Sequence, residues 1–324
     1  MKVAILDDWF DTLRGLPCFK KLNGFDITIF NDHIADTDEL AKRLAPFDVI
    51  VLFRERTAIT DPLIAKLPNL KLISQRGVYP HIDLNSCTRH GVLLCSDMHH
   101  DTPNHAAAEL TWALIMCAMR KIPQQMAHMR EGYWQLGVGK TLFGRTLGLY
   151  GYGRIAKSVE TYAHAFGMKV LWWGSELGRE TALMDGKRVA SSRELFFSSS
   201  DVVSLHVRLK HSTKGIIKAA DFAQMSSEAV FVNTSRAGLI EPGAMLAGLN
   251  AGRPGIAALD VFDIEPIKNI KDPLLRHENV ICTPHIGFVT EDEFELQFSK
   301  IFDQIVAFNH GHPRNMVNPE VWVK

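Results

Sequence analysis

Three loops in the C-terminal half of the chain place charged side chains shortly after apolar runs. Arg236, Glu265 and His285 each follow one of three successive runs of this kind. An arginine binds a carboxylate through two N–H groups, a histidine exchanges protons near neutral pH, and a carboxylate can orient a histidine ring. Taken singly, these residues could be part of a helix cap, a turn acid and an ordinary histidine. Together and in this order, they favour proton transfer on a small anionic molecule.

A second motif is a glycine-rich turn between a predicted strand and a predicted helix. Gly151, Gly153 and Ala156 match the G-x-G-x-x-G/A dinucleotide fingerprint, with alanine in its third place. The first glycine permits a tight turn, the second lets the backbone approach a pyrophosphate, and the alanine allows close helix–strand packing. The N–H groups near Arg154 and Ile155 would then face an anion at the start of the helix. The motif therefore predicts a dinucleotide site.

The choice between NAD and NADP depends on the end of the next predicted strand. Gly174 stands where an acidic residue would bind the ribose hydroxyls of NAD. Glu176 lies two residues further on and could reach them, whereas Ser175 and Arg179 could instead bind the 2′-phosphate of NADP. Either charge could also be a solvated loop residue. We predict NAD or NADP, with NAD slightly favoured because the carboxylate is nearer to the strand end.

The elements that must position these residues follow a repeated strand–helix pattern. Helical patterns, such as those at 36–45 and 60–67, separate short apolar runs. This alternation indicates βαβ units and parallel sheets. We therefore predict an α/β fold of two doubly wound parallel-sheet domains, Rossmann- or flavodoxin-like, with an active-site cleft between them. The predicted strands are 2–7, 25–30, 48–53, 70–74, 91–96, 146–150, 169–173, 201–206, 229–234, 255–262 and 279–283.

Two helical patterns define the predicted domain organisation. The apolar segment 105–122 is expected to form one helix, buried on most sides, that joins the two sets of strands. The segment 290–311 is expected to form a long helix that returns to the first domain. The chain would cross between the domains near 98–104 and 286–291, which we expect to act as hinges. The predicted domains are 1–100 plus 290–324 for substrate binding and 101–289 for NAD(P) binding.

Length and composition exclude several classes of protein. The chain of 324 residues is long enough for two domains, and its 36 basic and 36 acidic residues cancel. A nucleic-acid partner is therefore not expected. The apolar run 110–119 is too short for a membrane span, which needs about 20 residues. The motif HGHP at 310–313 is interpreted as a solvated turn, and no metal site is predicted. The five cysteines lack CxxC spacing, which favours free thiols in the cytoplasm.

Taken together, the motifs resemble those of the D-isomer-specific 2-hydroxyacid dehydrogenase family. The resemblance covers essentially the whole chain and implies NAD(P)-dependent interconversion of a small D-2-hydroxy acid and its 2-keto acid. Glyoxylate or hydroxypyruvate reductases and phosphoglycerate dehydrogenases are the similar enzymes. Glu265 favours these activities over formate oxidation, because formate-oxidising relatives usually carry glutamine there. The motifs that carry the resemblance are GLYGYGRIA, DVVSLHVRLKHST, NTSRAGLIEPGAML, ALDVFDIEP and TPHIGFVT.

The resemblance also implies a role for each matching residue. His285 is the expected acid and base, Glu265 orients its ring, and Arg236 binds the substrate carboxylate. The backbone at Gly77 and Val78 resembles a loop that binds this carboxylate. The implied cofactor-binding residues are Gly151, Gly153, Arg154, Ile155, Glu176, His206, Thr234, Asp260 and Gly287, and the implied substrate-binding residues are Arg54, Gly77 and Val78.

The identity of the substrate is left open by departures from the family pattern. Tyr79 and Pro80 add bulk and rigidity where the family usually has a Gly-x-Gly-x-Asp run. Arg54, Arg56 and Arg76 could hold a phosphate or could form a solvated basic rim. The sequence is also too short for the regulatory C-terminal domain of many phosphoglycerate dehydrogenases, so none is expected.

Two functions from other classes compete with the enzyme. A nucleotide-sensing corepressor can share the fold and even the three charged residues, although such proteins usually add long disordered tails. A non-catalytic scaffold is the other alternative, and the complete set of Arg236, Glu265 and His285 argues against it. A small 2-hydroxy or 2-keto acid is the expected partner, and the resemblance also implies a homodimer.

Overall fold

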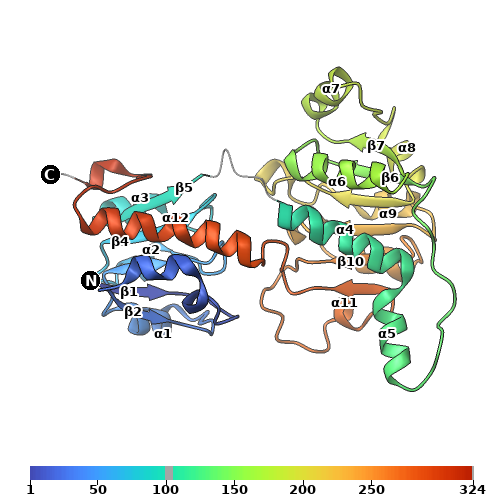
Figure 1. Ribbon diagram of the computed structural model, residues 1–324. Helices are drawn as coiled ribbons and strands as arrows, with labels where there is room; N and C mark the ends of the chain where they lie inside the picture. Colours follow the sequence, from blue (N-terminus) through green and yellow to red (C-terminus); the bar gives the residue numbers. More distant parts are fainter. Residues whose placement is uncertain (99–104, 323–324) are drawn as a thin grey trace. The chain divides into compact units, whose positions relative to one another are not determined.

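The computed structural model describes residues 1–98 and 105–322, and the chain folds as two compact units (Figure 1). One unit is formed by Met1–Pro103 together with Val289–Lys324, and the other by Asn104–Phe288. The expected crossing at 98–104 lies outside the described residues except at its first position. The second unit is thus inserted between two parts of the first.

The first unit contains a five-stranded parallel sheet in the order β2-β1-β3-β4-β5. Three short helices pack their apolar side chains on one face of this sheet, where Leu44, Ile64 and Cys87 are buried. The strands are β1 Lys2–Ile5, β2 Asp26–Ile29, β3 Val49–Val51, β4 Leu72–Arg76 and β5 Leu93–Asp97, and the helices are α1 Thr37–Leu44, α2 Asp61–Ile64 and α3 Leu84–Arg89.

The long helix α12, Glu291–Asn309, belongs to this first unit and packs against β4 and β5. Thr290 caps its start by accepting a hydrogen bond from the N–H of Glu293 at 3.2 Å. Its apolar positions recur at helical spacing, and Phe298 and Ile305 are fully buried. The Ser74 hydroxyl donates to the carbonyl of Ile301 at 3.0 Å, which fixes the helix on the sheet.

The second unit contains a six-stranded parallel sheet in the order β11-β10-β9-β8-β6-β7. Because β6 lies between β7 and β8, the strand order reverses there, and the loop after β6 sits where dinucleotides bind in such sheets. The two parallel α/β sheets confirm the predicted fold class. The strands are β6 Thr146–Tyr150, β7 Lys169–Trp173, β8 Val202–Leu205, β9 Val230–Asn233, β10 Ile256–Leu259 and β11 Val280–Cys282.

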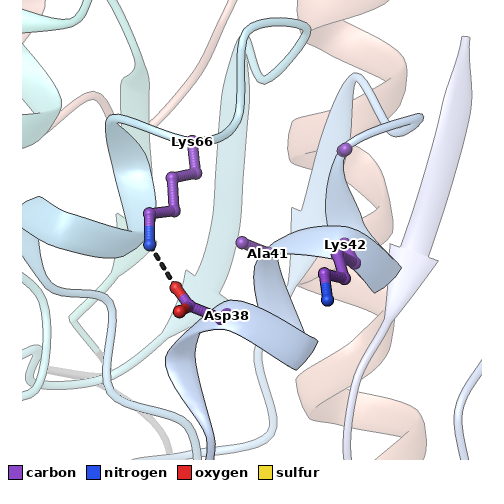
Figure 2. A pocket seen from close by; sticks show the side chains of 5 residues that line it. Asp38, Ala41, Lys42 and Lys66 are labelled. Atoms are coloured by element: carbon purple, nitrogen blue, oxygen red, sulfur yellow. Dashed lines mark hydrogen bonds and ion pairs between the residues drawn. The ribbon is translucent and has the colours of Figure 1, made fainter.

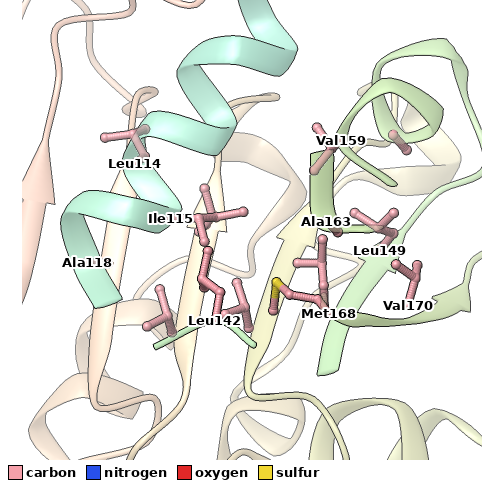
Figure 3. Packing of buried hydrophobic residues seen from close by; sticks show 14 of the residues in the cluster. Leu114, Ile115, Ala118, Leu142, Leu149, Val159, Ala163, Met168 and Val170 are labelled. Atoms are coloured by element: carbon pink, nitrogen blue, oxygen red, sulfur yellow. The ribbon is translucent and has the colours of Figure 1, made fainter. Parts of the chain in front are cut away.

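Helices cover both faces of this second sheet. On one face, Leu114 and Ile115 of α4 pack with Val159 and Ala163 of α6 around the strand residue Leu149 (Figure 3). On the other face, helices α8, α9 and α10 enclose a second apolar cluster. The helices of this unit are α4 His105–Arg120, α5 Ile122–Arg130, α6 Arg154–Ala165, α7 Glu176–Met184, α8 Arg193–Ser198, α9 Ala219–Gln224, α10 Ala244–Asn250 and α11 Pro273–Arg276.

The helix predicted over 105–122 is confirmed as α4, which ends at Arg120, two residues earlier, because the helical path breaks at Lys121. This residue has a left-handed backbone, with φ of 53°, and a new helix, α5, begins at Ile122. Pro123 has no N–H to donate to the preceding turn, so an unbroken helix would lose a hydrogen bond there. Only His105, Glu109, Ala113 and Arg120 of α4 are exposed, so the helix is covered on most sides, as predicted.

Candidate active site

The glycine loop after β6 has the geometry that its sequence predicts. Gly151 has a φ of 109°, and a Cβ there would lie 2.4 Å from the carbonyl oxygen of His206. Gly153 is the N-cap of α6, and a Cβ there would meet nothing within 4 Å. Ala156 is fully buried between α6 and the sheet. The close turn, the open space above Gly153 and the tightly packed helix fit a dinucleotide pyrophosphate.

Arg154 and Ile155 form the first turn of α6, as the motif predicts. Their position places backbone N–H groups at the positive end of a twelve-residue helix, directly after the open space at Gly153. These residues would therefore hold the pyrophosphate mainly through the backbone.

The end of β7 lies directly against the glycine loop. A Cβ on Gly174 would sit 3.5 Å from the backbone of Gly151. Ser175 caps α7 by accepting from the N–H of Gly178 at 3.2 Å, and Glu176 is the exposed first residue of that helix. The guanidinium of Arg179 lies 4.3 Å from the centroid of the Trp173 ring. An arginine is thus stacked on an aromatic ring at the strand end that adjoins the cofactor loop.

His206 follows β8 and contributes to the same region. Its Nε2 lies 3.0 Å from the hydroxyl of Ser204, and its carbonyl is the group that a side chain at 151 would strike. Burial lowers the pKa of His206 to about 4. The ring is therefore neutral at physiological pH and offers hydrogen bonds without adding charge.

The loop after β9 presents Arg236 through a turn built by Asn233. The amide of Asn233, which is fully buried, accepts from the N–H of Ser235 at 2.9 Å and donates to the carbonyl of Arg236 at 3.0 Å. Thr234 hydrogen-bonds Thr111 of α4 through the two hydroxyls at 2.7 Å. Asn233 was not predicted as a site residue, although its place at the end of a strand and before a turn is a usable signal.

Asp260 ties the loop after β10 to the loop that carries His285. The carboxylate is fully buried and accepts from the Thr283 hydroxyl at 2.6 Å and from the N–H groups of Ile286 and Gly287 at 2.8 and 2.9 Å. The pKa of Asp260 is raised, because the effect of burial exceeds the lowering by these hydrogen bonds. A Cβ on Gly287 would come 3.1 Å from the same carboxylate, which explains a glycine at that position.

His285 and Glu265 form a direct pair in the second unit. Nδ1 of His285 lies 2.5 Å from Oε2 of Glu265, whose other oxygen accepts from the N–H of Phe262 at 2.8 Å. Burial raises the pKa of Glu265, but the hydrogen bond and charge of His285, the N–H of Phe262 and the charge of Arg236 outweigh it, and the net pKa is lowered. Glu265 is therefore a carboxylate, and Nε2 is the ring nitrogen that can exchange a proton with a ligand.

The backbone and the neighbours of His285 fix its direction further. The residue has a left-handed backbone, with φ of 53°, and its ring meets Phe288 edge-on with centroids 5.7 Å apart. Uncommon backbone conformations of this kind persist where the surroundings impose them, often at functional sites. Arg236, Glu265 and His285 are thus brought together in one unit, with Asp260 and Asn233 as supports.

The expected substrate-binding residues lie in the first unit, at the carboxyl ends of its strands. Gly77 has a φ of 99°, its N–H donates to the carbonyl of Asp97 at 2.8 Å, and its own carbonyl accepts from Gln75 and Ser96. Val78 follows it in the same turn. Arg54, also left-handed with φ of 57°, comes after β3 and lies 3.3 Å from Glu293.

A surface hollow between α1 and α2 does not resemble such a site (Figure 2). Its lining includes Ala41, Lys42 and an ion pair between Lys66 and Asp38, whose side chains are at least half exposed. Exposed pairs of this kind contribute little binding energy. The carboxyl ends of the strands therefore remain the candidate site.

Comparison with known proteins decides the family. Residues 112–287 match the family described as D-isomer specific 2-hydroxyacid dehydrogenase, NAD binding domain. The chain belongs to this family. It is 35% identical over 285 residues to D-3-phosphoglycerate dehydrogenase of Methanocaldococcus jannaschii, which covers 87% of this chain and 53% of that protein. It is 30% identical over 332 residues to glyoxylate reductase of Korarchaeum cryptofilum, covering 95% and 93% respectively.

A solved structure extends the family likeness to the whole chain. The putative D-3-phosphoglycerate dehydrogenase oxidoreductase from Ralstonia solanacearum matches with a TM-score of 0.96 and 44% identity, over 100% of this chain and 98% of that one. The chain spans about half the length of the D-3-phosphoglycerate dehydrogenases it matches among curated relatives. These comparisons confirm the family resemblance and a dinucleotide of the NAD(P) class as cofactor. Along 1–98 and 105–322, the helices lack the combination of length and apolar character that a membrane crossing requires.

Proposed function

We propose that this protein is an NAD(P)-dependent oxidoreductase that interconverts a small D-2-hydroxy acid and its 2-keto acid. The observation that carries the proposal is the pair of His285 Nδ1 and Glu265 Oε2 at 2.5 Å, in the same unit as a dinucleotide loop. Relatives in the same family are named as glyoxylate reductase, hydroxypyruvate reductase and D-3-phosphoglycerate dehydrogenase, which supports this class of substrate.

The three charged residues would act on one carboxylate and one oxygen of the substrate. During oxidation, Nε2 of His285 accepts the proton of the substrate hydroxyl, and during reduction the protonated ring returns it to the carbonyl oxygen. Glu265 holds the ring and stabilises its positive charge. Arg236 binds the substrate carboxylate and polarises the oxygen at C2. The bound nicotinamide supplies or accepts the hydride.

A spectrophotometric screen tests this function. Purified protein is mixed with glyoxylate, pyruvate, hydroxypyruvate or longer 2-keto acids, and the absorbance of NADH or NADPH is followed. We expect the reduced nicotinamide to be consumed with at least one acid of this set. Tight cofactor binding without turnover across the whole set would favour the sensor or scaffold alternative instead.

The stacking of Arg179 supports a preference for NADP(H), against the slight preference for NAD that the sequence suggested. Its guanidinium is stacked on Trp173, a geometry that leaves the N–H edge able to bind a phosphate. Since Gly174 supplies no carboxylate at the strand end, we propose NADP(H) as the cofactor. We expect Arg179→Ala to lower the ratio of kcat/KM for NADPH over NADH about tenfold or more. Glu176→Ala is the matched control, and a rise in that ratio for this variant, with no change for Arg179→Ala, would assign NAD(H).

A homodimer is proposed through α5 and the segment that follows it. Helix α5 contains no buried residue, and Figure 1 shows it extending from the end of α4 before the chain returns to β6. Met129, Trp134 and Val138 are 61%, 73% and 87% exposed, and large exposed apolar side chains gathered in one segment are typical of an interface. We expect light scattering to give twice the chain mass, and Trp134→Glu to give a monomer. A monomeric wild type would reject the dimer.

The location in the cell is also a proposal. All five cysteines, Cys18, Cys87, Cys95, Cys117 and Cys282, are free thiols. Free thiols persist in a reducing compartment, so we propose the cytoplasm.

A further inference from the structure

The three arginines at the strand ends of the first unit are engaged with other groups of that unit. Arg76 is 2% exposed, with Asp97 at 3.9 Å and Glu293 at 3.5 Å. Arg56 donates to the carbonyl of Asp7 at 2.7 Å and lies over the rings of Phe10 and Phe53. A phosphoryl group would therefore find these two guanidinium groups already used in structural contacts.

The local balance of charge also disfavours a second anionic group on the substrate. Arg54 shares its positive charge with Glu293, whose Oε1 lies 3.3 Å from the guanidinium. The strand ends, the loops after them and the first turn of α12 carry six acidic residues against these three arginines, and a phosphoryl group would meet their repulsion. The acidic residues are Asp7, Asp8, Asp11, Glu55, Asp97 and Glu293.

Instead, the loop after β1 presents two aromatic side chains at this edge. Trp9 and Phe10 are 39% and 37% exposed, although exposing large apolar rings is unfavourable. Phe10 packs against Phe294 of α12 at a centroid distance of 6.0 Å, and Trp9 stacks on His33 at 6.4 Å. Both rings therefore pack on one neighbouring ring and stay partly exposed after β1, near the carboxyl ends of the parallel strands, where ligands of such sheets bind.

Buried polar groups hold this loop in place. Asp7, left-handed with φ of 59°, is 1% exposed and contacts His33 at 2.8 Å and Thr57 at 2.5 Å. Asp8 is fully buried and accepts from the N–H of Leu13 at 3.3 Å, and its carbonyl accepts from the amide of Asn31. A loop anchored in this way holds the two aromatic rings in place, and such preorganisation favours binding.

We infer that Trp9 and Phe10 form the subsite for the C3 substituent of the substrate, and that this substituent is aromatic or bulky and apolar rather than phosphorylated. The inference rests on the proposed function, since it concerns the substrate of the same site. Arg54 is partly exposed and lies between these rings and the Gly77 turn in the sequence. It is the residue that would border the keto-acid end of such a ligand. The ligand class is thus an arylpyruvate or the corresponding D-2-hydroxy acid.

Turnover and binding by the wild-type protein separate this inference from the proposed function. We expect kcat/KM for phenylpyruvate to exceed that for 3-phosphohydroxypyruvate at least about tenfold. Calorimetry with D-phenyllactate and D-3-phosphoglycerate, each in the presence of the oxidised dinucleotide, should rank the two ligands in the same order. Preference for the phosphorylated ligand in both measurements would overturn the inference and leave the proposed function intact. If the protein reduces none of phenylpyruvate, 3-phosphohydroxypyruvate, glyoxylate and pyruvate, the proposed function is rejected. Calorimetry would still show which of the two ligands the subsite binds more tightly.

Variants test whether the rings of Trp9 and Phe10 themselves cause the preference for an aromatic substrate. We expect Trp9→Ala and Phe10→Ala to raise KM for phenylpyruvate about tenfold or more, while KM for glyoxylate stays within about twofold of wild type. Phe25→Ala is the matched control, because Phe25 precedes β2 at the opposite, amino end of the same sheet. Thermal unfolding identifies a variant that fails to fold, and Trp9→Phe and Phe10→Leu then provide milder changes. Equal losses with both acids would show that the rings support the fold only, and would overturn the subsite.

Discussion

We expect His285→Ala to lower kcat about 10²–10⁴-fold while the dissociation constant of the dinucleotide changes little. The ring is the proposed proton donor and acceptor, whereas the cofactor loop lies after a different strand of the same sheet. Initial rates with the best 2-keto acid from the screen give kcat, and the quenching of tryptophan fluorescence gives the cofactor affinity. A variant with wild-type kcat would remove His285 from this role.

Glu265→Gln refines the same test, because it keeps the shape of the side chain and removes its charge. The lowered pKa of Glu265 reflects net stabilisation of the carboxylate, to which the charge of His285 contributes. By reciprocity, the variant should stabilise the protonated ring less, so the loss of reduction rate on the alkaline side of the pH–rate profile should begin at lower pH. An unchanged profile would show that Glu265 does not act on the ring. Thermal unfolding controls for a loss of structure in both variants.

The positions of the strands could be predicted well from the sequence, because each strand is a short apolar run. The strand ends in turn indicated where ligands bind. The glycine loop was equally readable, since Gly151 and Gly153 are needed for reasons of backbone space alone. The support given by Asp260 to the loop of His285 was not readable, because it depends on three hydrogen bonds to residues 23 to 27 positions away. Only the packing of β10 beside β11 brings those partners together.

The arginines at the strand ends of the first unit show the same limit of prediction from the sequence. From the sequence, Arg54, Arg56 and Arg76 were equally open to binding a phosphate. The structure distinguishes them, because Arg76 is buried beside Glu293 and Arg56 lies over aromatic rings. Ion pairing between residues more than 200 positions apart leaves no mark in a single sequence. The end of α4 is a milder case, since the left-handed backbone at Lys121 ends the helix two residues before the predicted bound.

Alanine at the two glycines of the cofactor loop should affect stability differently and should weaken dinucleotide binding in both cases. Gly151→Ala places a methyl group 2.4 Å from the His206 carbonyl and forces φ of 109° on alanine, so we expect it to destabilise the fold by at least about 1–3 kcal/mol and to weaken dinucleotide binding. Gly153→Ala meets no atom within 4 Å and has a φ of −125°. Its stability should stay within about 1 kcal/mol of wild type, because the reduced entropy of the unfolded chain offsets a less favourable N-cap residue.

The methyl group at 153 would nevertheless occupy the space through which the backbone approaches the pyrophosphate. We therefore expect the dissociation constant of the dinucleotide to rise about tenfold or more in Gly153→Ala, with nearly unchanged unfolding in denaturant. Calorimetry with the oxidised cofactor measures the first quantity and urea denaturation the second. The control is Gly252→Ala, at a turn remote in sequence with φ of 72°, which should be destabilised without loss of cofactor affinity. If Gly153→Ala bound the dinucleotide as tightly as wild type, the open space above this glycine would not be the pyrophosphate site, and the cofactor would have to lie elsewhere along the strand ends.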